Sequence, residues 1–315
     1  MRDLRIVFMG TPDFAVGVLK KLLEEDKNIV GVITAPDRPA GRGRKLKPSA
    51  VKEFALSKNL PVLQPTNLKD DNFLTELKAL EVNLQIVVAF RMLPKVVWSL
   101  PDYGTFNLHA SLLPQYRGAA PINWAIINQE EKTGVTTFFI DEKIDTGAII
   151  LKEEVSISEN ETAESLHDTL MELGSELVVK TVSKIEIDEA NPIPQIKDIT
   201  IKDAPKLTSE NTRINWNESV ETIDAFIRGL SPYPVAWSML ENEGETLKAK
   251  IYSATKEMVA HSEKPGTVTT DKKNMKVAAK NGYIYIKVLQ LPGKRKMDIG
   301  SLLNGFSFAK EAKLV

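Results

Sequence analysis

The chain has 315 residues, of which 43% are hydrophobic and 26% are charged, with 41 Lys and Arg residues against 42 Asp and Glu residues. This balance is typical of globular proteins and argues against a disordered chain. The absence of cysteine excludes disulfides, thiolate metal sites and thiol nucleophiles, and it suits a reducing compartment.

The net charge of −1 conceals an asymmetry along the chain. Residues 206–315 carry 17 Lys and Arg residues against 12 Asp and Glu residues, which leaves the preceding part acidic. A basic C-terminal part suits a polyanionic partner, although surface charge of this size serves solubility as often as binding. No apolar run approaches the roughly 18 residues needed to span a bilayer, so we expect a soluble protein.

Strand and helix patterns alternate through the first 190 residues. In chain order, the predicted elements are a strand at 4–9, a helix at 14–23, a strand at 29–34, a helix at 49–57, a strand at 62–63, a helix at 71–80, strands at 84–89, 134–140 and 148–155, and a helix at 161–185. This alternation predicts the α/β class, with a doubly wound, mostly parallel sheet covered by helices on both faces.

The remaining residues follow a different pattern. Residues 191–208 have no hydrophobic period and predict a linker. After it come a helix at 218–228 and five short strands at 236–240, 246–253, 266–270, 275–279 and 283–289. Short strands at close spacing predict a small β-barrel similar to the oligonucleotide-binding type. We therefore expect an α/β domain over 1–190, a linker over 191–208 and a barrel domain over 209–315.

The segment 104–121 contains the strongest candidate for a reactive centre. It places Asn107 and His109 two residues apart and then closes in a proline-bounded turn. Side chains alternate between the two faces of a strand, so Asn107 and His109 would share one face. The apolar residues beside them, Phe106 and Leu108, would then point into the core.

An acidic loop between two later strands could bring a carboxylate to this imidazole. Spacing alone does not choose between Asp141 and Asp145, and either could instead be a simple turn acid. A carboxylate beside His109 would favour the imidazolium and orient the ring. No serine or cysteine nucleophile and no metal cluster accompanies these groups, so they favour direct acyl transfer, with the amide and imidazolium stabilising an oxyanion.

The turn after the first predicted strand, at 10–15, stands where a dinucleotide fold carries its glycine-rich motif. Pro12 replaces the middle glycine, which must let the backbone approach a pyrophosphate, so nicotinamide and flavin cofactors are not expected. We expect Thr11 or Asp13 to cap the helix that follows. Phe14 fits either the core or the wall of a ligand cleft.

The segment 36–48 places five cations between three prolines and has no apolar period. This composition predicts an exposed loop. Charge runs are usually solvated faces, but Arg and Lys also supply most of the affinity for nucleic-acid phosphates. Because the segment directly follows the second predicted strand, at the edge that carries the reactive centre, we expect it to bind phosphates.

Several blocks of the sequence match a known family. They are residues 8–15, 37–47, 107–121 and 145–147, followed by 206–208, 214–216, 227–230 and 231–237. On these blocks the chain resembles the methionyl-tRNA formyltransferase family over nearly its whole length. The resemblance implies transfer of a formyl group from 10-formyltetrahydrofolate to the α-amino group of methionyl initiator tRNA. It implies no metal, and we expect a monomer in the cytoplasm.

Two other functions remain as alternatives. A formyltransferase could act on a small amine, such as an amino sugar nucleotide or glycinamide ribonucleotide, although such an enzyme needs neither a basic loop nor a basic barrel domain. A non-catalytic RNA-binding protein could keep an inactive α/β domain, but the intact Asn107, His109 and Asp145 argue against it.

The resemblance also assigns roles to individual residues. Asn107, His109 and Asp145 match the catalytic trio, which selects Asp145 over Asp141, and Phe14 is expected beside the methionyl side chain. Folate contacts are expected from Ser111, Leu112, Leu113 and Pro114 in the turn, and from Phe90, Arg91, Met92 and Leu93 around the pterin. Contacts with tRNA are expected from Arg38, Arg42, Arg44 and Lys45, and from Lys294, Arg295 and Lys296.

One position departs from the family pattern. Where the family commonly has Tyr-Gly, this chain has Phe90 and Arg91, which look more like glycinamide ribonucleotide formyltransferase. The departure affects the expected side chains of the pterin pocket and leaves the expected reaction unchanged.

Overall fold

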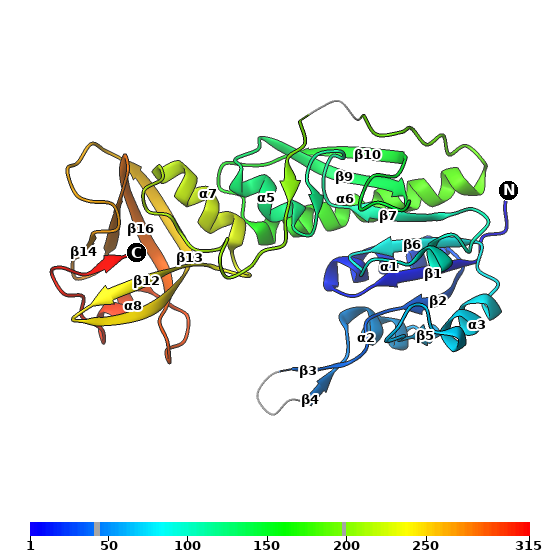
Figure 1. Cartoon of the computed structure of the whole chain (residues 1–315), viewed down its shortest axis with the longest axis horizontal. Helices are drawn as coiled ribbons and strands as arrows, with labels where there is room; N and C mark the ends of the chain where they lie inside the picture. Colours follow the sequence, from blue (N-terminus) through cyan, green and yellow to red (C-terminus); the bar gives the residue numbers. More distant parts are fainter. Residues whose placement is uncertain (41–44, 197–199) are drawn as a thin grey trace. The chain divides into compact units, whose positions relative to one another are not determined.

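The computed structural model describes residues 1–40, 45–196 and 200–315 (Figure 1). The chain forms two compact units, neither of which is continuous in sequence. The first comprises Met1–Gly118, Thr133–Val155 and His167–Asp203, and the second comprises Ala119–Lys132, Ser156–Leu166 and Ala204–Val315. Each predicted domain is continuous in sequence, so the prediction does not include Ala119–Lys132 and Ser156–Leu166 in the second unit. In the described part of the chain, no helix combines the length and apolarity needed to cross a bilayer.

The first unit is built around a seven-stranded sheet with the order β10-β9-β7-β6-β1-β2-β5. Its strands are β1 (Ile6–Gly10), β2 (Ile29–Ile33), β5 (Val62–Leu63), β6 (Leu84–Val88), β7 (Thr105–His109), β9 (Lys132–Phe139) and β10 (Ile149–Ser156). The pairs from β7 to β5 are parallel, and β9 is antiparallel to β7. All five residues of β1 are buried, as expected for a strand covered on both faces. The mostly parallel sheet is confirmed.

Helices pack on both faces of this sheet. They are α1 (Asp13–Glu24), α2 (Ala50–Ser57), α3 (Asp71–Ala79), α4 (Lys95–Trp98) and α6 (Ala163–Glu186). Val7 and Met9 of β1 share a buried cluster with Phe73 of α3 and Val97 of α4. On the other face α6 approaches β7 closely, because a Cβ at Gly174 would lie 2.8 Å from Leu108 Cδ2. The doubly wound arrangement is confirmed.

Helix starts differ from the prediction at one site. α1 begins after Pro12, which has an extended backbone, and no side chain caps the helix. The predicted cap by Thr11 or Asp13 is therefore wrong, since the Pro12 carbonyl accepts the first N–H bond, from Ala15, without help from either side chain. α2 does have a side-chain cap, because the Ser49 hydroxyl accepts from the N–H of Lys52.

Two short ribbons connect these elements. β3 (Arg38–Ala40) pairs with β4 (Lys45–Lys47), with Arg38 opposite Lys47, and β8 (Arg117–Gly118) pairs with β11 (Asp203–Ala204). The prediction of a loop throughout 36–48 is therefore wrong for the residues of β3 and β4. A solvated ribbon of charged residues carries no apolar alternation, which is the signal that sequence patterns offer for strands.

The second unit is a nearly closed antiparallel barrel with helices packed against it. Its sheet has the order β14-β15-β16-β13-β12-β18, and β17 pairs with β16. These strands are β12 (Ala236–Asn242), β13 (Glu245–Met258), β14 (Val268–Thr270), β15 (Met275–Ala279), β16 (Gly282–Gln290), β17 (Met297–Asp298) and β18 (Lys313–Leu314). The predicted barrel is confirmed, with the two-residue strands β17 and β18 in addition to the five predicted.

Amphipathic helices complete the core of the second unit. These are α5 (Pro121–Ile127), α7 (Val220–Leu230) and α8 (Ile299–Leu303). α7 buries Val220, Ile223 and Ile227 at helical spacing in the same cluster as the inward residues of the barrel. α5 packs on α7, because a Cβ at Gly229 would lie 2.7 Å from Ile127 Cγ1. This contact explains why residues 119–132 belong to the second unit.

The barrel closes where β18 meets the chain before β14, and Gly266 makes this closure possible. Its carbonyl accepts from the Leu314 N–H at 2.8 Å. Its φ is +87°, and a Cβ there would lie 2.2 Å from the Leu314 carbonyl oxygen.

Gly266→Ala should therefore destabilise the second unit by more than the strain of a left-handed alanine alone, because its Cβ would also clash with the Leu314 carbonyl. Gly293→Ala is the matched control, because Gly293 has φ +73° with no atom within 4 Å of a Cβ. A left-handed non-glycine residue costs about 1–2 kcal/mol, so the control should lose that much in denaturant unfolding and Gly266→Ala clearly more. Equal losses for the two variants would contradict the closure described here.

Candidate active site

The first unit presents the carboxyl ends of β1, β6 and β7 along one edge of its sheet. β6 is parallel to both β1 and β7, so the three strands end at the same edge. The strand order reverses at this point, because β2 lies on one side of β1 and β6 on the other. In open α/β sheets, ligands bind in the crevice at such a point. The segments that follow these strands are therefore the candidate site.

Asn107 and His109 both lie on β7. Their neighbours Phe106 and Leu108 are buried in the core, as the alternation predicts. Asn107 is half-buried, and within the described part of the chain its side-chain amide makes no hydrogen bond to protein. A half-buried amide without a protein partner is available to a ligand.

His109 is buried, and each of its ring nitrogens faces an oxygen atom. Nε2 lies 2.8 Å from the carbonyl oxygen of Tyr116, and because a carbonyl can only accept, the ring donates from Nε2. Nδ1 lies 3.9 Å from Oδ2 of Asp145, which is too long for a hydrogen bond but close enough for attraction between charges. A main-chain carbonyl thus orients the ring, and a carboxylate stands beside the remaining nitrogen.

The structure brings Asp145, and not Asp141, to the imidazole. The Asp145 carboxylate accepts from the Gly118 N–H at 3.0 Å. Asp141 instead accepts from the Thr146 hydroxyl at 2.8 Å and from the N–H of Lys143 at 3.0 Å, as a turn acid does. Among the described residues, no group of three or more His, Cys, Asp or Glu side chains is arranged to hold a metal ion.

Gln195 holds the loop that carries Asp145, and no sequence pattern indicates this role. Its buried amide donates to the carbonyl oxygens of Asp145 and Gly147, both at 2.9 Å. Its own carbonyl accepts from Nη2 of Arg117 at 2.6 Å. The loop itself is tightly packed, since a Cβ at Gly147 would lie 1.6 Å from the Phe139 carbonyl oxygen. Gln195 falls in the stretch predicted as a linker, so this part of the stretch is an ordered brace.

The turn expected to bind folate follows β7 directly. Ser111 and Leu113 are buried, whereas Leu112 and Pro114 are half-buried. The Ser111 hydroxyl donates to the Gln115 carbonyl at 2.6 Å, so it serves to shape the turn. Leu112 and Pro114 are therefore the members of this group that present surface to a ligand.

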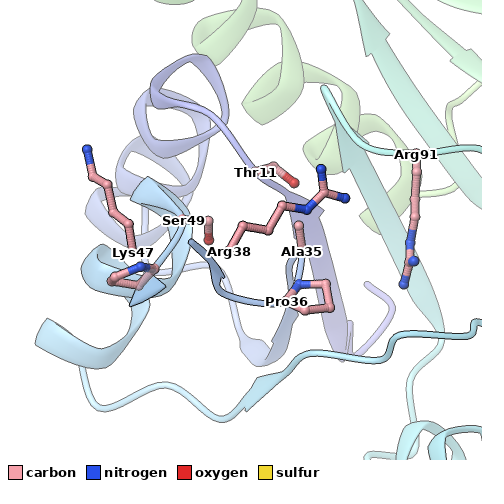
Figure 2. A pocket seen from close by; sticks show the side chains of 8 residues that line it. Thr11, Ala35, Pro36, Arg38, Lys47, Ser49 and Arg91 are labelled. Atoms are coloured by element: carbon pink, nitrogen blue, oxygen red, sulfur yellow. The ribbon is translucent and has the colours of Figure 1, made fainter. Parts of the chain in front are cut away.

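The group expected around the pterin divides in the same way. Leu93 is buried and Phe90 is half-buried against the same apolar cluster, whereas Arg91 and Met92 are exposed. The Arg91 guanidinium donates to the carbonyl of Thr66 at 2.9 Å and to that of Pro65. These bonds hold Arg91 beside a cavity next to β1 and β2 (Figure 2).

Phe14 lies in the first turn of α1 and is buried. Its ring meets the His167 ring edge-on, with centroids 5.2 Å apart. The structure therefore places Phe14 just after β1, at the edge that carries the candidate site, as part of a buried aromatic pair.

The basic residues expected to bind tRNA come from two segments. Arg38 lies exposed on β3, whereas Arg42, Arg44 and the Lys45 side chain lie outside the described residues. In the second unit Lys294, Arg295 and Lys296 are exposed between β16 and β17. The Lys296 Nζ lies 4.5 Å from the centroid of the Tyr252 ring, so this turn combines cations with an aromatic face.

Removing the Gln195 side chain should loosen the Asp145 loop. Gln195→Ala deletes three hydrogen bonds and leaves buried groups unpaired, so we expect a loss of about 1–3 kcal/mol in the free energy of unfolding. The Gly118 amide, which donates to Asp145, should exchange its hydrogen faster. Asn191→Ala removes an exposed amide from the same segment and is the control. Unchanged exchange at Gly118 would show that Gln195 does not hold this loop.

Comparison with known proteins agrees with the two-part organisation. A family model described as "Formyl transferase" matches residues 4–182, and one described as "Formyl transferase, C-terminal domain" matches residues 206–307. The methionyl-tRNA formyltransferase of Flavobacterium johnsoniae is 59% identical over 314 residues, covering 100% of both chains. That of Flavobacterium psychrophilum is 56% identical over 315 residues, covering 99% of each chain.

A solved structure shares the fold at much lower identity. HypX from Aquifex aeolicus, in complex with tetrahydrofolic acid, matches with a TM-score of 0.66 and 18% identity. The match covers 96% of this chain and 47% of HypX, so the chain spans about half the length of that protein. With both family models matched in order and relatives above 50% identity along the whole length, the chain belongs to the methionyl-tRNA formyltransferase family.

Proposed function

We propose that this chain transfers the formyl group of 10-formyltetrahydrofolate to the α-amino group of methionyl initiator tRNA, giving N-formylmethionyl-tRNA for translation initiation. The observation that carries the proposal is the side-chain amide of Asn107, which has no hydrogen-bond partner among the described residues and lies two residues from a histidine whose Nδ1 faces Asp145 at 3.9 Å. The full-length relative from Flavobacterium johnsoniae, at 59% identity, bears the name of this activity.

The proposed reaction is a direct transfer with no covalent enzyme intermediate. The amine attacks the formyl carbon, and the electron pair of the C=O bond moves to oxygen. The Asn107 amide and the protonated Nδ1 of His109 donate to this oxyanion. When the carbonyl re-forms, the bond to N10 of the folate breaks, N10 takes up a proton, and the attacking amine loses one. Asp145 assists this proton transfer.

The substrates are assigned to separate parts of the site. We assign the folate to the surface of Leu112 and Pro114 and to the segment from Phe90 to Leu93, because these parts flank the end of β7. Phe14, after β1, borders the methionyl group. No metal, nicotinamide or flavin enters the proposed reaction. The protein acts as a monomer in the cytoplasm, where initiator tRNA is charged.

The tRNA is assigned to two basic surfaces. The first comprises Arg38, Arg42, Arg44 and Lys45, and the second comprises Lys294, Arg295 and Lys296. Cations supply the sequence-independent part of nucleic-acid binding, and aromatic rings stack on exposed bases. Tyr252, beside Lys296, offers such a ring.

Loss of either oxyanion donor should slow turnover without weakening tRNA binding. Asn107→Ala and His109→Ala are each expected to lower kcat about 10²–10³-fold, with KM for charged tRNA changed only a few-fold. The assay combines 10-formyltetrahydrofolate with methionyl initiator tRNA, and it includes elongator tRNA and small amines as competing acceptors. His261→Ala, a histidine of the second unit, is the control and should keep normal kcat.

Two results of this assay would contradict the proposal. Near-normal turnover by His109→Ala would remove the imidazole from the reaction. Equal efficiency with a free amino sugar nucleotide or glycinamide ribonucleotide would instead favour a small-molecule formyltransferase.

Neutralising the basic segment should weaken tRNA use in a salt-dependent manner. Replacing Arg42 and Arg44 with Met removes up to two phosphate contacts, so the slope of log affinity against log salt should fall by about 1–2 units. The measurement is KM for charged tRNA over a salt series. Identical slopes for the variant and the natural chain would take these residues out of the interface.

A further inference from the structure

A cavity of about 380 Å³ lies at the carboxyl ends of β1 and β2 in the first unit. Its polar lining comes from Thr11, Arg38, Lys47, Ser49 and Arg91 (Figure 2). Figure 2 shows Arg38 extending from β3 toward Thr11, with Arg91 on the other side of the cavity. Arg38 pairs with Lys47 in the β3–β4 ribbon, but in Figure 2 the Lys47 side chain extends away from Arg38. The ribbon and the segment after β6 therefore contribute Arg38 and Arg91 to one space.

Nothing in the described part of the chain neutralises these cations. Neither Arg38 nor Lys47 forms an ion pair there, and Arg91 bonds only to main-chain carbonyls. The nearest carboxylate in sequence, Asp37, is held by Gln64 and Lys52 at 2.8 and 2.7 Å, and these bonds lower its pKa. The partial desolvation of the Arg91 guanidinium and then the charge of Arg38 lower the pKa of Arg91. The cavity therefore collects positive charge that no carboxylate of the described residues pairs with.

We propose that this cavity is a phosphate site that holds the 5′-phosphate of the terminal nucleotide of the acceptor RNA. The inference rests on the proposed function and adds a specific contact to it. Guanidinium groups recognise phosphate oxygens through paired N–H donors, and the Thr11 hydroxyl, which caps no helix, is a further donor.

The distances along the sheet agree with this occupant. Adjacent strands lie about 4.8 Å apart, so β1 and β2 lie roughly 10 and 15 Å from β7, which carries His109. In an aminoacyl-tRNA, about eight bonds separate the α-amino nitrogen from the 5′-phosphorus of the terminal nucleotide, a reach of roughly 10 Å when extended. An amine at the end of β7 would thus place its phosphate near the end of β1.

The position also favours RNA over the glutamyl carboxylates of the folate. Leu112 and Pro114, which are assigned to the folate, follow β7, whereas the cavity lies at the ends of β1 and β2, on the other side of β6. Arg91 is the one residue of the segment assigned to the folate that also lines the cavity. The ribbon that supplies Arg38 and Lys47 continues in sequence through Arg42 and Arg44. Several cations close together in sequence match a chain of phosphates better than a single small acid.

The test compares Arg91→Met and Arg38→Met with Lys78→Met, a control that removes an exposed cation from α3. We expect each cavity variant to raise KM for charged initiator tRNA about 5–10-fold and to lower the salt slope by about 1 unit. For Arg38→Met, which lies outside the segment assigned to the folate, the kcat value and KM for 10-formyltetrahydrofolate should stay unchanged. Inorganic phosphate should inhibit the natural chain in competition with tRNA, and should inhibit both variants less.

Each alternative outcome has a distinct meaning. Unchanged KM for tRNA and unchanged salt slopes in both variants would overturn the phosphate site and leave the proposed function intact. A rise in KM for folate alone in Arg38→Met would assign the cavity to the glutamyl group and also overturn the phosphate site. Failure of the natural chain to formylate charged initiator tRNA would overturn the proposed function itself. Arg91→Met also removes the hydrogen bonds to Pro65 and Thr66 and could disturb the local structure. Arg38→Met controls for this effect, because the Arg38 side chain makes no hydrogen bond to the main chain of the described residues.

Discussion

The hydrogen bond from His109 Nε2 to the Tyr116 carbonyl is the contact on which the rest of the site depends. Nε2 lies 2.8 Å from a carbonyl oxygen, which can only accept, so the proton of the neutral ring is on Nε2. The same bond turns Nδ1 toward Asp145. Tyr116 is itself fixed, with φ of +59° and its own N–H bonded to the carbonyl of Lys202. A ring held in this way can gain a proton at Nδ1 and donate it without reorienting, which is the preorganisation that oxyanion stabilisation requires.

The carboxylate beside that nitrogen is positioned from a distant part of the chain. Asp145 lies in a loop whose carbonyls bond to Gln195, and Arg117 in turn bonds to Gln195. Each such bond contributes about 1 kcal/mol net, and more is lost if a buried partner remains unpaired. Gln195 and Lys202 thus support both partners of His109, the carboxylate through the Asp145 loop and the carbonyl through Tyr116. This dependence explains why an apparently irregular stretch is in part closely packed.

Local patterns in the sequence predicted most of the fold but only part of the site. Apolar periodicity locates β1 and α6, and alternation on β7 pairs Asn107 with His109, because these signals depend on near neighbours. The roles of the Tyr116 carbonyl and of Gln195 arise from contacts between distant segments, and a main-chain acceptor has no sequence signature. Arg91 illustrates the same limit. Its bonds to the main-chain carbonyls of Pro65 and Thr66, which hold it beside the cavity at β1 and β2, have no sequence signature.

The most direct test of this arrangement is the tautomer of the His109 ring, measured by nitrogen-15 NMR of the imidazole in the full-length protein. We expect the neutral ring to carry its proton on Nε2 and to leave Nδ1 unprotonated. A neutral ring protonated on Nδ1 would show that the Tyr116 carbonyl does not orient the imidazole, and would contradict the proposed route of charge stabilisation.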